Sequence, residues 1–179
     1  MIMTNKIKHS NLYLIGPMGA GKSSVGKQLA KQLGMDFYDS DEEIEKSTGV
    51  DLGWIFDIEG EDGFRKRETA VLADLTQHAN IVLATGGGTV VESANQQMLS
   101  ERGVLIYLEV SLEHQEPRVV NESRRPALRV KNRQEVLKQL QEERLPIYES
   151  LADFKVHTDN RSVRAVTDDI IAWLKEHKK

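Results

Sequence analysis

Short apolar runs alternate with amphipathic stretches along the chain. The runs that predict strands are 11–15, 36–38, 80–84, 103–108 and 153–157. The stretches with helical spacing of apolar residues are 22–33, 41–48, 62–77, 93–101, 111–121, 132–145 and 162–177. Strands that alternate with helices indicate βαβ units. We therefore expect an α/β fold with a short, mainly parallel sheet of about five strands and helices on both faces.

The first predicted strand leads into a glycine-rich turn. Gly16–Ser23 fits G-x-x-x-x-G-K-[ST] at every fixed position and runs directly into the predicted helix 22–33. Its glycines let backbone N–H groups surround an anion at a helix N-terminus. Lys22 adds a positive charge for the phosphates, and Ser23 offers a hydroxyl to Mg²⁺. The alternative, a chance glycine-rich turn, is disfavoured by the complete motif and its flanks, so the sequence predicts a P-loop.

Composition narrows the class of protein. The chain has 179 residues, 39% of them hydrophobic and 29% charged, with a net charge of −4 and no cysteine. These values suit one globular domain over 1–179 and argue against a general nucleic-acid binder. Disulfides and thiolate chemistry are excluded. The start of the chain lacks the apolar core of a signal peptide, and no apolar run approaches the ~20 residues of a membrane span. We expect a cytoplasmic protein without a membrane partner.

Polar or glycine residues follow two further strands. Asp39 and Asp41 come after the strand at 36–38, where one carboxylate could hold Mg²⁺ and the other could accept a proton. The alternative is helix capping by Ser40 or Asp41 alone. Gly86, Gly87 and Gly88 follow the strand at 80–84, and either approach a ligand closely or form a flexible loop. Ligands bind beyond the carboxyl ends of parallel strands, which favours the functional interpretation of both segments.

These segments together resemble the shikimate kinase family, within the P-loop group that includes the nucleoside-monophosphate kinases. The matching pieces, in chain order, are Gly16–Ser23, Asp39-Ser40-Asp41, Gly63-Phe64-Arg65 with Glu68, Thr85–Gly88, Arg125-Pro126 and Arg144–Tyr148. The resemblance covers about residues 10–175. It implies a three-layer P-loop kinase fold with strand order 2-3-1-4-5 and a mobile lid. It also implies ATP-dependent phosphorylation of the 3-hydroxyl of shikimate, with Mg²⁺ as cofactor, by a monomer.

On the nucleotide side, the resemblance assigns five side chains. Lys22 would contact the transferred phosphate, and Ser23 and Asp39 would hold Mg²⁺. Arg125, in the lid, would reach the nucleotide phosphates, and Arg118 would lie against the adenine. The other nucleotide contacts would come from Gly19, Ala20, Gly21 and Ser24.

On the acceptor side, the resemblance makes Asp41 the residue that binds the shikimate hydroxyls and orients or deprotonates the 3-hydroxyl. Arg65 and Arg144 would clamp the carboxylate, for which guanidinium forks are suited. The loop contacts to the acceptor would come from Gly86, Gly87 and Gly88. Taken singly, Arg65 could belong to a solvated helix face and Arg144 to a surface ion pair. Only the joint pattern favours the clamp.

A basic segment lies in the predicted lid at about 118–131. It indicates a closure over ATP phosphates, with a nucleic-acid patch or a solvated loop as alternatives. Pro117 falls inside the predicted helix 111–121, where it costs about 3 kcal/mol in a regular helix. We expect this helix to kink or to end near residue 116. Our hypothesis is that activity survives and nucleotide affinity is altered, because the placement of Arg118 depends on this helix.

Two other functions stay open from the sequence. One is another small-molecule kinase of the same group, such as a gluconate kinase. The other is a nucleotide-dependent binding or regulatory module that transfers nothing. Convergence of Arg65 and Arg144 near Asp41 would favour an acceptor with a carboxylate and hydroxyls. The set Lys22, Ser23, Asp39 and Asp41 argues against a pure binder.

Overall fold

A five-stranded parallel sheet forms the centre of the molecule. The computed structural model describes residues 11–121 and 124–177. The strands are β1 (Asn11–Ile15), β2 (Asp36–Asp39), β3 (Ile81–Ala84), β4 (Gly103–Glu109) and β5 (Phe154–His157). Their order is β2-β3-β1-β4-β5, and every neighbouring pair is parallel. Both the parallel sheet and its expected order are confirmed, so β1 lies at the centre, and the carboxyl ends of β1 and β3 lie side by side.

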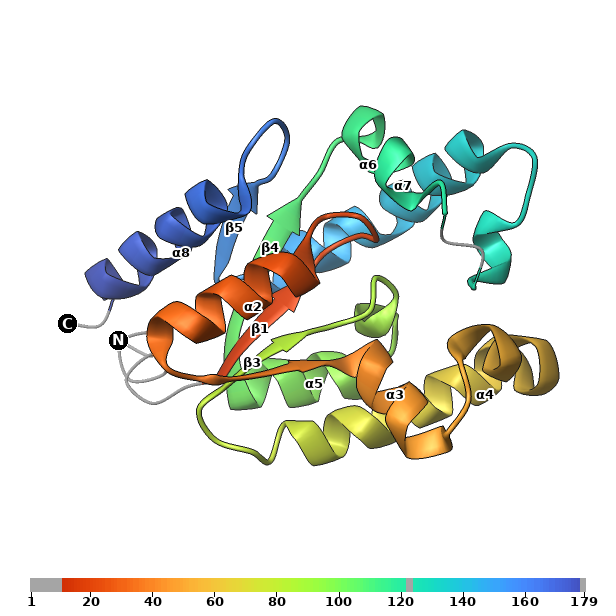
Figure 1. Cartoon of the computed structure of the whole chain (residues 1–179), viewed down its shortest axis with the longest axis horizontal. Coiled ribbons are helices and arrows are strands. Elements are labelled where there is room, and N and C mark those ends of the chain that lie inside the picture. The colour runs from red at the N-terminus through yellow and green to blue at the C-terminus, as the bar shows by residue number, and fades with distance from the viewer. Residues whose placement is uncertain (1–10, 122–123, 178–179) are drawn as a thin grey trace.

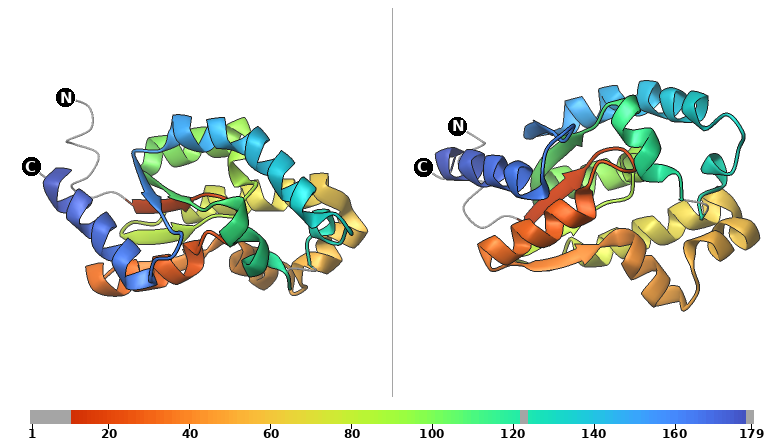
Figure 2. Two further views of the ribbon diagram at one scale, coloured as in Figure 1. Left: turned by 90° about the horizontal axis from the view of Figure 1, so that it is seen from above. Right: turned by 45° about the horizontal axis from the view of Figure 1, so that its top comes forward.

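Helices cover both faces of the sheet (Figure 1). Their bounds are α2 (Lys22–Leu33), α3 (Ser40–Thr48), α4 (Leu52–Leu75), α5 (Ser93–Arg102), α6 (Leu112–Val119), α7 (Arg133–Leu151) and α8 (Val163–His177), with 3-10 turns η1 (Thr89–Val91) and η2 (Pro126–Leu128). Figure 2 shows α2 and α8 on one side of the sheet and α5 and α7 on the other. Residues such as Leu14 and Leu29 form the core on the first side, and Tyr13, Leu72 and Tyr148 form the core on the second.

A smaller core joins α3 to α4. It contains Ile44, Ile55 and Phe64. The helix expected at 62–77 begins ten residues earlier, at Leu52, and its added first part packs in this core through Leu52 and Ile55. Gly60, with φ of 71°, interrupts it. This break separates the helical period into two short pieces, and the first piece exposes Trp54 and Ile58 on its surface. The break at Gly60 and these exposed apolar side chains both weaken the pattern that predicts a helix in the first part of α4.

Proline does not end helix α6 or helix α7. α6 continues through Pro117 to Val119, so of the two expected outcomes an end near residue 116 is wrong, and a kink there stays a prediction. Pro117 is exposed and in the last turn, where solvent can reach the carbonyl left without its N–H donor. α7 likewise runs through Pro146 to Leu151, beyond the predicted end at 145. Among the described residues, none of these helices has the length and apolar character needed to cross a membrane.

Candidate active site

The carboxyl ends of β1, β2 and β3 open into one cavity of about 420 Å³. Its wall combines the P-loop, the start of α3, the glycine loop after β3 and the basic segment after α6. The predicted site residues that line it are Gly19, Lys22, Ser23, Asp39, Asp41, Gly86, Gly87, Arg118 and Arg125. Residues that are far apart in the sequence are thus brought together where a parallel sheet binds ligands.

The P-loop is held by the Lys22 side chain and by close packing at Gly16. Gly16 and Gly19 have positive φ values, and a Cβ on Gly16 would lie 2.4 Å from the carbonyl oxygen of Leu108. Lys22 is 8% exposed, and its Nζ donates to the carbonyls of Gly16 at 2.7 Å and Pro17 at 2.8 Å. Burial lowers the pKa of Lys22 to about 8, against the opposing charge of Asp41. An anionic ligand would restore the charge of this lysine.

Ser23 and Asp39 form a pair of oxygen donors beside the P-loop. The Ser23 hydroxyl donates a hydrogen bond to Oδ2 of Asp39. Oδ1 of Asp39 accepts from the backbone N–H groups of Asp41, at 2.9 Å, and Glu42, at 3.3 Å. Asp39 itself is therefore the N-cap of α3, in place of Ser40 or Asp41. A hydroxyl and one carboxylate fit Mg²⁺ that takes its remaining ligands from phosphates and water. Among the described residues, no group of three or more His, Cys, Asp or Glu could hold a metal ion, so ligands from phosphates and water would be needed.

Asp41 lies between the P-loop and the basic segment. Its Oδ2 accepts a hydrogen bond from Nη2 of Arg125. Its Oδ1 is buried and lacks a hydrogen-bond partner in the described structure. A Cβ on Gly86 would lie 3.3 Å from that oxygen. A buried carboxylate oxygen without a donor is costly, and a ligand hydroxyl would satisfy it.

A second cavity, of about 280 Å³, adjoins the first. Arg65, Arg125 and Arg144 line it, together with Met18, Phe56, Glu61, Pro126, Ala127 and Leu140. Met18 and Arg125 line both cavities. The two arginines predicted to clamp a carboxylate therefore converge on one space, and Arg125 stands where the two spaces meet. This arrangement offers one compartment to phosphates and the next to a small anion.

Glu68 positions Arg65 in that compartment. It is fully buried in α4, where its Oε1 accepts from Nη1 of Arg65 at 2.8 Å and its Oε2 accepts from the Thr89 hydroxyl at 2.7 Å. The guanidinium lies directly against Gly88, because a Cβ there would be 2.2 Å from Nη2 of Arg65. Gly88 is therefore needed for close approach.

Arg118 connects the P-loop to the loop after β5. Its Nη1 donates to the Gly19 carbonyl at 2.9 Å, and its Nη2 donates to the Thr158 carbonyl at 3.4 Å. Gln115, one turn earlier in α6, donates to the Met18 carbonyl at 2.9 Å. Two consecutive turns of α6 thus hold the P-loop despite Pro117. Contact of Arg118 with adenine stays a prediction.

The residues that line the first cavity differ in part from those predicted from the sequence. Of the predicted nucleotide contacts, Ala20, Gly21 and Ser24 do not line the cavity. Residues that line the first cavity without having been predicted are Met18, Glu42, Glu45, Thr85, Val119 and Arg124. Met18 and Thr85 lie inside the quoted motifs and Arg124 lies in the basic segment, whereas Glu42, Glu45 and Val119 reach the cavity only through the way the chain crosses the strand ends. Tyr148, in the quoted segment Arg144–Tyr148, lines neither cavity, but its position four residues after Arg144 puts both on one face of α7.

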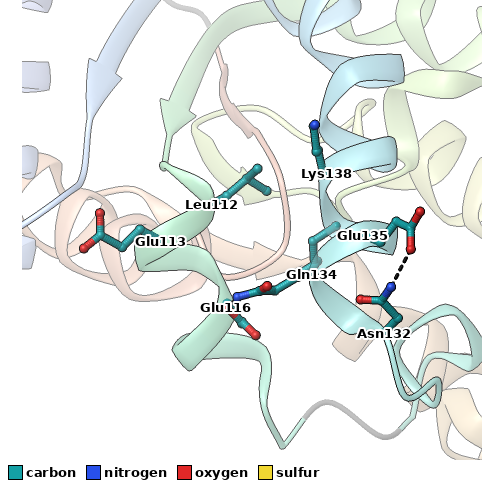
Figure 3. A pocket seen from close by; sticks show the side chains of 8 residues that line it. Leu112, Glu113, Glu116, Asn132, Gln134, Glu135 and Lys138 are labelled. Carbon is teal, nitrogen blue, oxygen red and sulfur yellow. Dashed lines mark hydrogen bonds between the residues drawn. The ribbon is translucent and has the colours of Figure 1, made fainter.

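A separate groove of about 560 Å³ runs between α6 and α7 (Figure 3). Leu112 and Leu137 give it an apolar part, and Glu113, Glu116 and Glu135 contribute carboxylates. None of the predicted site residues lines it. Its carboxylates would repel a polyphosphate, which favours the first cavity for a nucleotide.

The fold and the paired cavities define a P-loop kinase. Comparison with known proteins agrees, since the shikimate kinase family model matches residues 18–175. The chain belongs to the shikimate kinase family. A shikimate kinase from Vibrio parahaemolyticus serotype O3:K6 is 54% identical over 93% of this chain and 96% of its own length.

Solved structures give the same family. A shikimate kinase from Acinetobacter baumannii in complex with shikimate is similar with a TM-score of 0.93 and 41% identity, over 98% of each chain. A gluconokinase from Sinorhizobium meliloti has a TM-score of 0.54 and 17% identity over 93% of this chain. The second likeness is one of fold alone.

Proposed function

We propose that this protein phosphorylates the 3-hydroxyl of shikimate with ATP and Mg²⁺, giving shikimate 3-phosphate and ADP for chorismate and aromatic amino acid biosynthesis. The observation that carries the proposal is the pair of adjoining cavities that share Arg125. One contains the P-loop and the other contains Arg65 and Arg144. Membership of the shikimate kinase family supports the same acceptor.

In the proposed reaction, the residues of this chain position two substrates and neutralise charge. Lys22 and the P-loop N–H groups bind the phosphates, and Arg65 and Arg144 bind the acceptor carboxylate. Asp41 takes the proton of the attacking hydroxyl, whose oxygen bonds to the γ-phosphorus as the bond to ADP breaks. Ser23 and Asp39 would hold Mg²⁺, which would supply further charge neutralisation. Arg125 exchanges its bond to Asp41 for the phosphates.

The same proposal covers the behaviour of the whole chain. The segment 118–131 closes over the nucleotide as a lid on a single domain. The protein acts as a monomer, which is supported by the lining of both cavities with residues of one chain. It works in the cytoplasm, where ATP is available.

Two alternatives are less well supported. A gluconate kinase would share the fold, but two arginines at one small cavity suit a carboxylate held on a ring with hydroxyls beside Asp41. A module that only binds nucleotide would not need the orphaned Asp41 oxygen aimed beside Gly86.

A coupled ADP-release assay tests the proposal. Shikimate, quinate, gluconate and nucleoside monophosphates are compared side by side, each with Mg²⁺ and with a chelator. Turnover that depends on Mg²⁺ and is highest with shikimate is expected. Faster turnover with gluconate or a nucleoside monophosphate would show that this compound is the acceptor in place of shikimate. Absence of turnover with all four would favour the binding module.

A further inference from the structure

Tyr148 lies next to the two groups that are proposed to bind the acceptor, Arg144 and the glycine loop Gly86–Gly88. It is 1% exposed in α7, and its ring stacks on Tyr107 of β4 with 5.1 Å between centroids. Arg144 is four residues earlier on the same helix face. From this position the Tyr148 hydroxyl donates a hydrogen bond across to the carbonyl of Gly87, in the loop after β3.

The hydroxyl has a defined direction of hydrogen bonding. A guanidinium can only donate and a backbone carbonyl can only accept. Burial raises the pKa of Tyr148 to about 12, and the charge and hydrogen bond of Arg144 oppose that rise. The phenol is therefore neutral at ordinary pH, and its oxygen accepts from Arg144 while its proton goes to Gly87. Phenylalanine at this position would break both links at once.

The bond to Gly87 also sets a peptide plane. In a trans peptide the carbonyl oxygen and the following N–H point in opposite directions. Holding the Gly87 carbonyl toward Tyr148 thus fixes the direction of the Gly88 N–H. Gly88 lies against the Arg65 guanidinium, and a Cβ on Gly87 would be 3.1 Å from the Met18 backbone nitrogen. The glycine loop is consequently bounded by Arg65, the P-loop and Tyr148.

We infer that Tyr148 is a positioning residue for the acceptor, because its single hydroxyl couples the Arg144 guanidinium to the peptide between Gly87 and Gly88. The inference rests on the proposed function, in which Arg144 and the glycine loop bind shikimate. It predicts that loss of the hydroxyl weakens acceptor binding and leaves nucleotide binding in place.

Tyr148→Phe is the test, with Tyr13→Phe as the matched control. Tyr13 is equally buried, and its hydroxyl donates to a backbone carbonyl, that of Arg102, at 3.3 Å beside the amino end of β4. For Tyr148→Phe the Michaelis constant for shikimate is expected to rise about tenfold, with that for ATP within about twofold of wild type. Tyr13→Phe is expected to change neither constant, although both variants lose some thermal stability.

A double-mutant cycle separates coupling from general loosening. Combining Tyr148→Phe with Arg144→Ala should raise the Michaelis constant for shikimate less than the product of the two single effects. Independent, multiplicative effects would overturn the inference, as would equal losses for ATP and shikimate or an unchanged constant in Tyr148→Phe. Wild-type protein without shikimate turnover would instead refute the proposed function.

A second measurement keeps the inference testable if Tyr148→Phe does not fold. Arg144→Ala removes the donor to the Tyr148 oxygen from an otherwise intact helix. The Gly88 amide resonance in a ¹⁵N spectrum of this variant should then shift, because the bond to Gly87 changes. An unshifted Gly88 resonance would show that no coupling exists.

Discussion

The P-loop and the described part of the proposed lid segment, residues 118–121 and 124–131, face the same cavity but are held by different kinds of contact. The P-loop is fixed by buried bonds from Lys22 to its own carbonyls and by close packing at Gly16. The lid segment is held mostly by charged pairs, such as Arg129 to Asp57 at 2.8 Å. Val119 and Leu128 are its buried apolar residues. Exposed ion pairs each contribute about 0–1 kcal/mol, so only the first region is rigidly prepared for phosphate.

Arg125 shows what this difference means for the site. Its bond to Asp41 is a contact between the lid segment and the fixed wall. A substrate can replace such a bond without rearranging the core. Under the proposed function, the P-loop side would provide a permanent anion site, and the lid side would provide charges that change partners when substrates arrive.

The largest expected effect is at Asp41, where the two regions meet. Asp41→Asn keeps the size of the side chain but removes the proton acceptor, so turnover should fall by about 10²–10⁴-fold while ATP binding persists. Turnover and ATP affinity are measured separately. Glu42→Gln, which alters the next carboxylate at the same cavity, is the control and should retain turnover. Unchanged turnover in Asp41→Asn would remove this residue from the mechanism.

A smaller effect is expected at Arg65, on the acceptor side of the fixed wall. Arg65→Ala should raise the Michaelis constant for shikimate by roughly 10–100-fold, since a charged hydrogen bond is lost. Arg67→Ala is the matched control, because Arg67 is exposed and pairs with Glu59 outside the cavities. If both variants raise the constant equally, the carboxylate clamp is rejected.

The lowered pKa of Lys22 makes nucleotide binding depend on pH. Free Lys22 loses its proton as pH rises through about 8, whereas bound phosphates raise its pKa. Binding must then take up a proton above pH 8, and nucleotide affinity should fall by up to about tenfold between pH 8 and 9. Calorimetry of ADP binding in buffers of different ionisation enthalpy measures the uptake. No uptake between pH 8 and 9 would contradict the assignment.

The smallest expected effect is on the lid side. Asp57→Asn removes the exposed pair with Arg129, so the free energy of unfolding should fall by less than about 1 kcal/mol. Tryptic cleavage near residues 124–131 should speed up modestly, with turnover unchanged. Glu59→Gln breaks an ion pair within α4 and is the control for cleavage. A large loss of stability in Asp57→Asn would show that the lid segment is as firmly held as the P-loop.

Much of the fold could be predicted because the strands are short, apolar and separated by helices. The strand ends then located Lys22, Asp39 and Asp41 at one cavity. The first half of α4 was missed, since Gly60 breaks its period. We expected α6 to kink or to end near residue 116; the early end was wrong, because a proline in an exposed last turn costs less than one in a helix interior. The link from Tyr148 to Gly87 depends on a tertiary contact, which local patterns do not encode.

The close approach of Arg65 to Gly88 has a consequence for inhibitor resistance. An inhibitor that imitates the acceptor could be avoided by a bulkier residue in the glycine loop. At Gly88, however, even a methyl group would displace the guanidinium that Glu68 and Glu61 hold in place. With Arg65 displaced from the proposed clamp, such a mutant would bind both the inhibitor and the natural acceptor less tightly. Compounds that bind against Gly88 therefore meet a position with little freedom to mutate.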